Sequence, residues 1–152
     1  MALKILDYGS PEYEQMVSLR SEVLRKPLGL SFTSEELEKE KNNILIGAFE
    51  DDTMLGCCML IRLNSEECQL RQMAVLNTLR GKGVGRAIMT FAENIARDRG
   101  FRIMRMHARA SSLGFYEKLG YATRGDEFIE ITIPHYIMEK PCNVGDDMVF
   151  GG

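Results

Sequence analysis

One glycine-rich segment has the residue types that a phosphate site needs. Glycines occupy alternate positions 81, 83 and 85, where a predicted strand leads into a predicted helix. A backbone without Cβ atoms can approach a ligand closely and can adopt positive φ. The first N–H groups of a helix have no intrahelical acceptor, and the helix dipole adds partial positive charge there. A diphosphate is the ligand that this arrangement favours.

Three cations surround these glycines. Arg80, Lys82 and Arg86 fall within seven residues of a chain whose formal net charge is −3. Local positive charge in an acidic chain favours a phosphate site over a simple turn. The alternative is a tight strand-to-helix connection that binds nothing. Residues 80–86 are called the glycine turn below.

The spacing of the glycines excludes two common nucleotide motifs. A dinucleotide fingerprint would need glycine at Arg86 if it began at Gly81, or at Ile88 if it began at Gly83. A P-loop needs four residues between its glycines and then Lys-Ser/Thr, which is not found here. The pattern that fits is Arg/Gln-x-x-Gly-x-Gly/Ala, satisfied by Arg80, Gly83 and Gly85.

A second motif follows one predicted helix and one predicted strand later. Residues Ser112–Tyr121 read Ser-Leu-Gly-Phe-Tyr-Glu-Lys-Leu-Gly-Tyr. With both motifs in this order, the chain resembles the GNAT superfamily of acyl-CoA-dependent N-acyltransferases from about Leu3 to Lys140. The glycine turn looks like that family's pyrophosphate motif, and the second segment looks like its Ala-x-x-Phe-Tyr-x-x-x-Gly-Phe/Tyr signature. Residues 133–140 also resemble a small bacterial branch of the family.

The resemblance implies acetyl-CoA as the cofactor and a set of residues that contact it. The implied contacts come from the end of the preceding strand and from the glycine turn: Met73, Ala74, Val75, Arg80, Gly81, Lys82, Gly83, Val84, Gly85 and Arg86. A backbone N–H near the end of that strand would stabilise the tetrahedral oxyanion. Where many members carry Asn, this chain has Arg109, which would contact a phosphate of coenzyme A or lie in solvent.

By the same resemblance, Tyr116 is the general acid that protonates the departing thiolate. A phenol with a pKa near ~10 is protonated at neutral pH. Adjacent helical side chains diverge by ~100°, so Phe115 and Tyr116 are not expected to face one core together. One aromatic ring in the core and one at a cleft is the expected arrangement, and two core rings is the alternative.

The general base is less well defined by the sequence. Glu130 is the candidate, on a strand face shared with Phe128 and Thr132, and solvent exposure without a role is its alternative. His107 and His135 are each expected to be structural rather than catalytic. Ordered water in place of any side chain is a further alternative. Glu66 and Glu67 look like turn residues.

The elements that position these residues describe an α/β fold. The strands expected from periodicity are 3–8, 43–49, 54–63, 68–76 with a bulge near its end, 101–108, 121–133 and 134–140. The helices expected begin at Pro11, with Ser10 as N-cap, near Ser34, with Thr33 or Ser34 as N-cap, at Val84 and near Ser111. This order indicates a mixed sheet with helices on both faces. The resemblance implies a GNAT-like, mostly antiparallel sheet of about seven strands.

Composition sets the broad class. The chain of 152 residues fits one domain, 1–152, with regular structure over about 3–140 and a tail over 141–152. The net charge of −3 argues against nucleic acid and anionic membranes as partners. The apolar run 54–61 is too short to cross a bilayer, and the start of the chain does not read as a signal peptide, so a cytoplasmic protein is expected. The four cysteines form no Cys-x-x-Cys pair; we expect no metal site, and buried thiols.

These observations predict an N-acetyltransferase that moves an acetyl group to a primary amine of a small molecule by direct attack. The alternative is a non-catalytic acyl-CoA-binding or regulatory module. Arg20, inside the apolar stripe of the first helix, would make a structural ion pair or line a substrate cleft. The sequence leaves the acceptor open, and it is compatible with a monomer or a homodimer.

Overall fold

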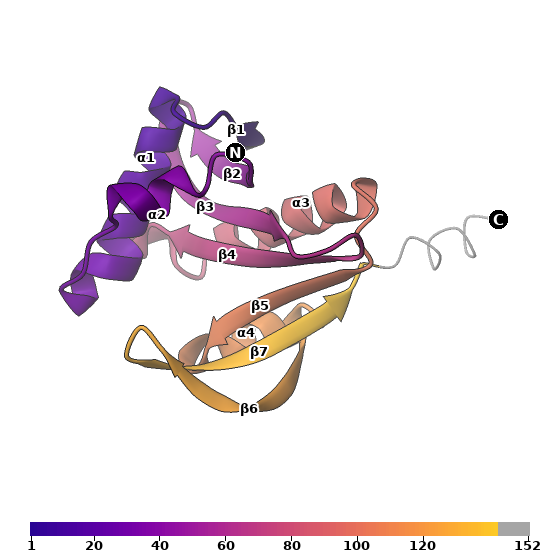
Figure 1. Cartoon of the computed structure of the whole chain (residues 1–152). Helices are drawn as coiled ribbons and strands as arrows, with labels where there is room; N and C mark the ends of the chain where they lie inside the picture. The colour runs from indigo at the N-terminus through magenta and orange to yellow at the C-terminus, as the bar shows by residue number, and fades with distance from the viewer. Residues whose placement is uncertain (143–152) are drawn as a thin grey trace. The chain divides into compact units, whose positions relative to one another are not determined.

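The computed structural model describes residues 1–142, and its strands form one seven-stranded sheet (Figure 1). The strand order is β1-β2-β3-β4-β5-β7-β6. The strands are β1 (Ala2–Leu6), β2 (Ile44–Glu50), β3 (Thr53–Arg62), β4 (Glu67–Val75), β5 (Ile103–Arg109), β6 (Ala122–Glu130) and β7 (Ile133–Pro141). β4 and β5 pair in parallel, whereas β1–β2, β2–β3, β5–β7 and β6–β7 pair antiparallel. The predicted mostly antiparallel sheet is therefore confirmed.

The chain divides into two compact units. Unit 1 comprises Met1–Ile61 and Arg71–Ala92, and unit 2 comprises Arg62–Leu70 and Glu93–Gly152. The chain passes from one unit to the other within β4 and within the helix α3 (Val84–Asp98). The prediction of one domain stays a prediction.

In unit 1 the helices begin where the capping residues predict. Ser10 accepts a hydrogen bond on Oγ from the N–H of Tyr13 at 3.1 Å, and Pro11 opens α1 (Pro11–Arg20). The chain then continues as a π-helical turn, Ser21–Arg25, and a 3₁₀ turn, Lys26–Leu28. Thr33 and Glu36 form a reciprocal capping box at the start of α2 (Ser34–Glu38).

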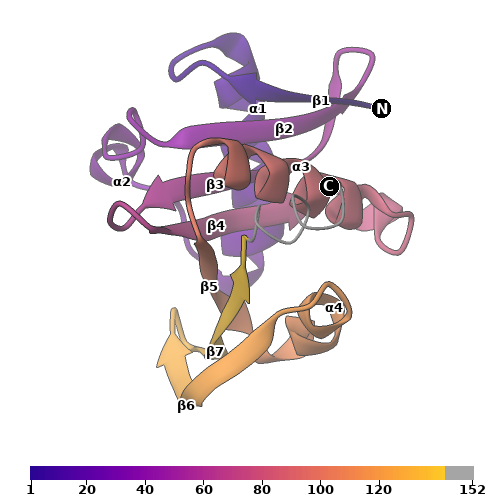
Figure 2. The same cartoon turned by 90° about the vertical axis from the view of Figure 1, so that its right-hand side faces the viewer.

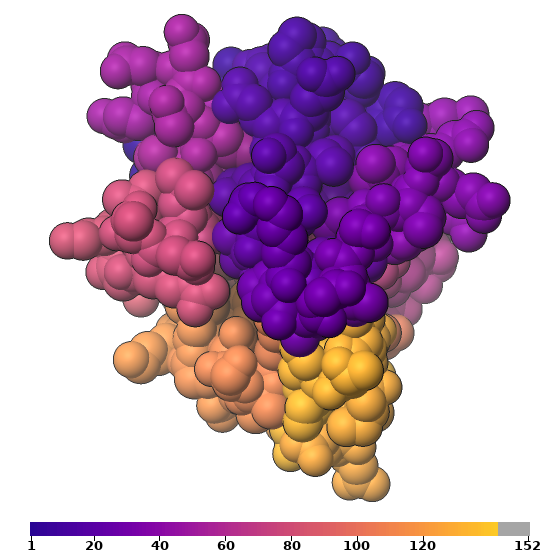
Figure 3. All heavy atoms as spheres, turned by 90° about the vertical axis from the view of Figure 1, so that its left-hand side faces the viewer, coloured from indigo at the N-terminus to yellow at the C-terminus, as the bar shows by residue number. Residues whose placement is uncertain are grey.

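The strands of unit 1 are covered on both faces. Figure 2 shows α3 in front of β3 and β4 and α1 behind them. In Figure 3, the segment from α1 to α2, coloured indigo to purple, lies across the α1 side of unit 1. β3 is buried along most of its length, as its two apolar faces predict. The core on the α1 side consists of Leu6, Tyr13, Met16, Leu19, Leu45, Phe49, Met54, Cys57, Met59 and Ala74.

Gly56 allows the first turns of α3 to pack closely on the sheet. A Cβ atom at this position would lie 2.7 Å from Cδ1 of Ile88, 3.0 Å from the carbonyl oxygen of Ala74 and 3.2 Å from Cγ1 of Val84. These three atoms belong to α3 and β4, the two elements that flank the glycine turn. Because Gly56 has no side chain, the helix that begins at this turn can pack directly against the sheet.

β4 contains the irregularity that its sequence pattern predicts. Gln72 has φ of 57°, a value that non-glycine residues adopt rarely. The parallel pairing with β5 joins Glu67–Leu70 to Ile103–Met106 and ends before this residue. The last residues of β4, Met73–Val75, follow Gln72 and lead into a 3₁₀ turn, Asn77–Leu79.

Unit 2 consists of β5, β7, β6 and the short helix α4 (Leu113–Lys118), which follows a 3₁₀ turn at Ala110–Ser112. The β6–β7 hairpin corrects the predicted strand boundary. Instead of a strand to residue 133, β6 ends at Glu130, and Ile131 and Thr132 form a turn with φ of 49° and 62°. Two positive φ values match the twist of a two-residue hairpin. The turn was not predicted because neither residue is a glycine, the residue that usually indicates such a turn.

The last predicted strand extends to Pro141. The predicted tail falls mainly on residues 143–152, which lie outside the described residues. In residues 1–142, every helix is too short or too polar to span a lipid bilayer.

Candidate active site

The glycine turn has the backbone conformation that a phosphate site needs. Gly81 and Gly83 have φ of 78° and 86°, and a Cβ atom at either would meet nothing within 4 Å. The space above both residues is therefore open. The first helical bond of α3 runs from the N–H of Ala87 to the carbonyl of Gly83 at 3.1 Å. The N–H groups of Val84, Gly85 and Arg86 precede this bond and so have no acceptor within the helix.

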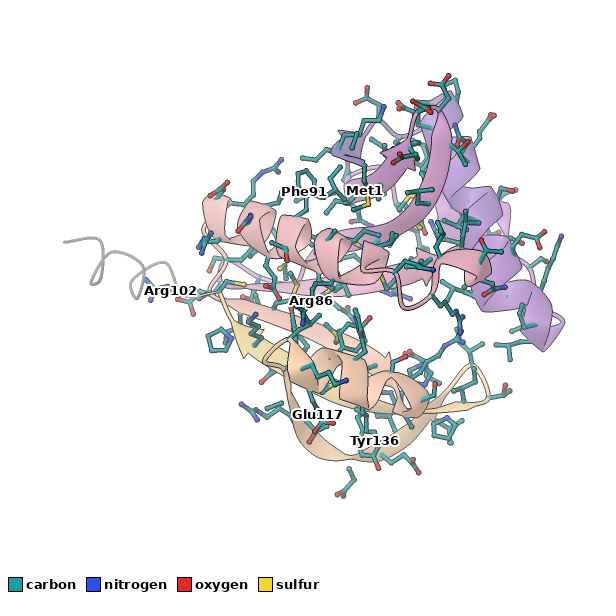
Figure 4. The ribbon with its side chains drawn as sticks, turned by 180° about the vertical axis from the view of Figure 1, so that it is seen from behind. Met1, Arg86, Phe91, Arg102, Glu117 and Tyr136 are labelled. Carbon is teal, nitrogen blue, oxygen red and sulfur yellow. The ribbon has the colours of Figure 1, made fainter. Side chains whose placement is uncertain are left out.

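The three predicted cations surround these N–H groups. Arg80 and Lys82 are exposed in the turn, and Arg86 is exposed on the first turn of α3 (Figure 4). Within residues 1–142, none of the three side chains pairs with a carboxylate. Two other cations of unit 1 are paired: Arg20 binds Glu40, and Arg25 binds Glu36. The glycine turn therefore combines unpaired positive charge with unpaired helix N–H groups, as expected for a diphosphate site.

The predicted contacts in β4 come directly after the irregularity at Gln72. Ala74 is buried, and Met73 and Val75 are half-buried. The strand ends where the N–H of Leu76 donates to the carbonyl of Leu55 on β3 at 2.9 Å. These contacts to coenzyme A, and the oxyanion donor in this strand, stay predictions.

Tyr116 lies on α4 in unit 2. Its side chain is buried, with 6% exposed, whereas its neighbour Phe115 is 39% exposed. The two rings diverge as expected, but Tyr116 is the more buried of the pair. Its ring packs edge-on against Phe115 and Tyr121, with centroids 5.0 and 5.9 Å apart. Tyr121 in turn donates its hydroxyl to Glu93 at 2.7 Å, which fixes this aromatic group.

The structure brings together three residues that the sequence treated separately. Nδ1 of His107 on β5 lies 2.9 Å from Oε1 of Glu130 on β6. Nε2 of His135 on β7 lies 3.8 Å from Oε2 of the same carboxylate. We call these three residues the histidine–carboxylate cluster. The hairpin register, which places Glu130 opposite Ile133, could have predicted this cluster. The register was missed because the turn was expected at the wrong residues.

The other candidate residues make structural contacts. Glu67 binds Nη2 of Arg105 at 2.8 Å, and the backbone carbonyl of Glu66 accepts from Arg102 and Ile103. Arg109 stands opposite His135 in the β5–β7 ladder.

Arg20 forms a structural ion pair, which was one of its two predicted roles. Its guanidinium is fully buried and forms two hydrogen bonds with Glu40, at 2.8 and 2.7 Å. Tyr13 also donates its hydroxyl to Glu40, and burial followed by this bond raises the pKa of Tyr13 above its usual range. Arg20 therefore ties α1 to the segment after α2.

The cysteines in residues 1–142 are free thiols. Cys57, Cys58 and Cys68 are fully buried, as predicted, and Cys142 is half-buried. Burial raises the pKa of the thiols of Cys57 and Cys68 to about 12. In residues 1–142, no group of three or more His, Cys, Asp or Glu side chains is arranged to hold a metal ion.

Comparisons with known proteins agree with the motifs. The acetyltransferase (GNAT) family matches residues 11–121. The N-acetyltransferase YjcF of Bacillus subtilis, described as uncharacterized, is 30% identical over 125 residues, which cover 80% of this chain and 87% of YjcF. Another B. subtilis protein named as an acetyltransferase is 34% identical over 80 residues. That match covers 53% of this chain and spans about half of the relative, 54% of its length.

Solved structures share the fold. A Lactobacillus plantarum protein named as an N-acetyltransferase superposes with a TM-score of 0.82 at 25% identity, over 94% of this chain and all of the other. An aminoglycoside 6′-N-acetyltransferase complexed with coenzyme A superposes with a TM-score of 0.80, over 94% and 98% of the two chains; at 20% identity this likeness concerns the fold. The predicted family is confirmed. The chain belongs to the acetyltransferase (GNAT) family.

Proposed function

We propose that this protein is an N-acetyltransferase that moves the acetyl group of acetyl-CoA to a primary amine of a small molecule by direct attack. The observation that carries the proposal is the glycine turn: Arg80, Lys82 and Arg86, which pair with no carboxylate in the part of the chain that the structure describes, lie in the same short segment as the N–H groups that open α3. Such a turn binds a diphosphate. Coenzyme A carries a diphosphate between its adenosine part and its pantetheine arm.

The residues of the chain have defined roles in this proposal. Val84, Gly85 and Arg86 donate backbone N–H groups to the diphosphate, and the side chains of Arg80 and Lys82 neutralise it. Bound acetyl-CoA supplies a thioester, whose carbonyl carbon is open to an amine. A backbone N–H near the end of β4, at Met73, Ala74 or Val75, stabilises the oxyanion.

Proton transfers complete the reaction. Tyr116 donates its hydroxyl proton to the departing thiolate, because a phenol is protonated at neutral pH and comparable to a thiol in acidity. Glu130 belongs to the group of residues that drains the proton from the amine. Its contact with His107 supports a place in that proton path.

A small molecule is the proposed acceptor class. The support is the fold likeness to an aminoglycoside 6′-N-acetyltransferase, an enzyme whose name gives a small polyamine as its acceptor. The buried free thiols are typical of a reducing compartment, and we propose the cytoplasm as the location. We propose that the protein works as a monomer or as a homodimer.

The test is release of free coenzyme A from acetyl-CoA across a panel of amines that includes aminoglycosides, amino acids and polyamines. Activity with at least one amine is expected. In parallel, acetyl-CoA should raise the melting temperature of the protein, since a ligand that binds only the folded state stabilises it. A protein that is stabilised by acetyl-CoA but releases no thiol with any amine would be a binding or regulatory module instead.

A matched pair of variants identifies the binding site. Gly83→Glu places a carboxylate in the glycine turn and should abolish the stabilisation by acetyl-CoA. Gly100→Glu is the control, because Gly100 has the same φ of 86° and the same open space but lies beyond the other end of α3. Equal loss of stabilisation in both variants would contradict the assignment of the glycine turn.

A further inference from the structure

The histidine–carboxylate cluster holds its two imidazole rings in different ways. All three members lie on one face of unit 2, each on a different strand: His107 on β5, His135 on β7 and Glu130 on β6. Phe128 packs against both rings, edge-on to His107 at 5.2 Å and stacked on His135 at 5.9 Å. The carboxylate therefore sits between two rings in a partly apolar setting.

The contact with Glu130 fixes the tautomer of His107. An ionised carboxylate can only accept hydrogen bonds, so Nδ1 of His107 carries the hydrogen in the 2.9 Å contact. In the neutral ring, Nε2 then carries a lone pair. Within residues 1–142, no group hydrogen-bonds to this Nε2, and the side chain is 32% exposed. In the neutral ring, Nε2 of His107 is therefore available as a base.

His135 differs from His107 in this respect. Its Nδ1 lies 2.7 Å from the carbonyl oxygen of Ile133, an acceptor, so Nδ1 carries the hydrogen. Its side chain is only 7% exposed, and its Nε2 faces Glu130. The ring is therefore enclosed and cannot meet a substrate. At 3.8 Å its Nε2 makes no hydrogen bond with Glu130.

These contacts also determine what Glu130 can do. Oε1 accepts the hydrogen bond from His107, and Oε2 faces His135. The group that Glu130 contacts directly is therefore the imidazole ring of His107. A carboxylate bound to Nδ1 orients an imidazole and stabilises its charged form, which is the arrangement of a histidine base and its orienting acid.

We propose that His107 is the general base of the acyl transfer and that Glu130 is its positioning residue. The inference rests on the proposed function and names the base that it requires. Nε2 of His107 removes a proton from the primary amine, and Glu130 holds the ring in the required tautomer. The sequence prediction of Glu130 as the base is thereby replaced by a two-residue arrangement.

The step balances in atoms and charge. The amine nitrogen forms a bond to the acetyl carbon, and the C–S bond breaks with its electron pair on sulfur. One amine proton moves to Nε2 of His107, and the hydroxyl proton of Tyr116 moves to sulfur. Transfer of the imidazolium proton to the tyrosinate through water restores both side chains. The products are an N-acetyl amine and coenzyme A thiol.

The charged neighbours of His107 in unit 2 are largely paired with one another. On the same face, Arg105 of β5 binds Glu67 and Glu139, and Arg124 of β6 also binds Glu139. On the neighbouring strands, Glu130 and His135 belong to the cluster itself. Arg109 lies two residues further along β5 on the same face. Glu130 is thus the carboxylate that His107 contacts.

The first experiment observes the tautomer directly, by NMR of isotope-labelled histidine nitrogens in the full-length protein across neutral pH. The chain has only two histidines, so one variant, His107→Gln, assigns both rings. His107 should carry its hydrogen on Nδ1 when neutral, although an unrestrained imidazole favours Nε2. A neutral His107 with its hydrogen on Nε2 would overturn the proposal.

The second experiment measures turnover with the amine found in the panel. His107→Gln should lower kcat by about 100-fold or more while the Kd for acetyl-CoA stays nearly unchanged. Added imidazole should restore part of the activity of His107→Ala. Glu130→Gln should lower kcat and leave the Kd for acetyl-CoA nearly unchanged, because a neutral amide stabilises the charged imidazole less than a carboxylate does. Glu127→Gln is the matched control: Glu127 is exposed on the same strand, and its variant should leave both kcat and Kd unchanged.

The outcomes separate the two proposals. Wild-type turnover that persists in folded His107→Gln or in folded Glu130→Gln overturns the role of His107 and leaves the transferase function standing. Absence of wild-type turnover with every amine overturns the function, and the base assignment with it.

Discussion

Arg20 and Glu40 form a two-bonded ion pair inside unit 1, with Nη1–Oε1 at 2.8 Å and Nη2–Oε2 at 2.7 Å. Arg20 has no exposed surface, and Glu40 is 6% exposed. The pair joins the end of α1 to a residue just beyond α2. The ring of Phe32 lies against the Arg20 guanidinium, 4.5 Å from its carbon, and adds a cation–π contact.

Removal of the arginine alone should therefore destabilise the protein strongly. Arg20→Met leaves the Glu40 charge buried without its partner, and the free energy of unfolding should fall by about 3–5 kcal/mol. Urea denaturation measures this change. The double variant Arg20→Met/Glu40→Leu removes both charges and should recover most of the loss; a double variant as unstable as the single one would show that the ion pair is not the cause.

The close packing at Gly56 makes a second stability prediction. Gly56→Ala puts a methyl group 3.0 Å from the Ala74 carbonyl, so the free energy of unfolding should fall by about 1–3 kcal/mol. The matched control is Gly114→Ala on α4, where a Cβ would meet nothing within 4 Å and where alanine favours the helix. Thermal denaturation of the two variants should separate them in opposite directions.

The cations of the glycine turn should contribute individually to cofactor affinity. Arg80→Gln, Lys82→Gln and Arg86→Gln should each raise the Kd for coenzyme A by about threefold to tenfold, since exposed charge–phosphate contacts are partly screened by solvent. Isothermal titration at two salt concentrations measures this, and wild-type affinity should fall as salt rises. Arg99→Gln, at the other end of α3, is the control; an equal effect there would indicate a general charge effect rather than a site.

Tyr116 should act on the chemical step and not on binding. Tyr116→Phe should lower kcat at saturating acetyl-CoA by about 100-fold, because the thiolate loses its proton donor, with the Kd for coenzyme A nearly unchanged. Steady-state kinetics and titration measure the two quantities. Tyr121→Phe loses the bond to Glu93 and should cost about 1–2 kcal/mol of stability while sparing kcat. Undiminished turnover in Tyr116→Phe would remove the acid role.

The buried thiols predict a loss of stability in alkali. Burial raises the pKa of the Cys57 and Cys68 thiols from an ordinary value of 9.0 to about 12. Between these values the unfolded chain releases protons that the folded chain keeps, so the unfolded state binds fewer protons and stability falls as pH rises. Each thiol should add about 1.4 kcal/mol of loss per pH unit within this window.

Urea denaturation between about pH 8 and about pH 11 measures this slope. Cys68→Ala should reduce it, whereas Met104→Leu, which alters the neighbour of Cys68 without removing a titrating group, should leave it as in the wild type. A slope that Cys68→Ala does not change would contradict the prediction.

Sequence reasoning predicted the elements that depend on local rules. The Ser10 and Thr33 caps, the irregularity in β4 and the glycine turn all follow from residues close in sequence, and each is found where the pattern indicates. The mostly antiparallel arrangement came from the resemblance to a family, because strand order depends on contacts between distant residues.

What the sequence did not predict depends on exact register and on packing. The histidine–carboxylate cluster requires Glu130 to stand opposite Ile133, and a turn of Ile131 and Thr132 lacks the glycine or asparagine that usually identifies such a hairpin. The relative burial of Phe115 and Tyr116 depends on how α4 is rotated about its axis, which a helix of six residues does not reveal. The partner of Arg20 is Glu40, which lies twenty residues away in the sequence, so no local pattern identifies the pair.

The path of the backbone through the two units has a practical consequence. Residues 62–70 of unit 2 interrupt unit 1, and both β4 and α3 change unit partway along their length. No single cut in the gene can therefore yield either unit whole, and a truncated product would retain half a strand or half a helix with nothing to complete it. Separate production of either half would require a gene from which the intervening segment is deleted, so that the two pieces of that unit are joined directly.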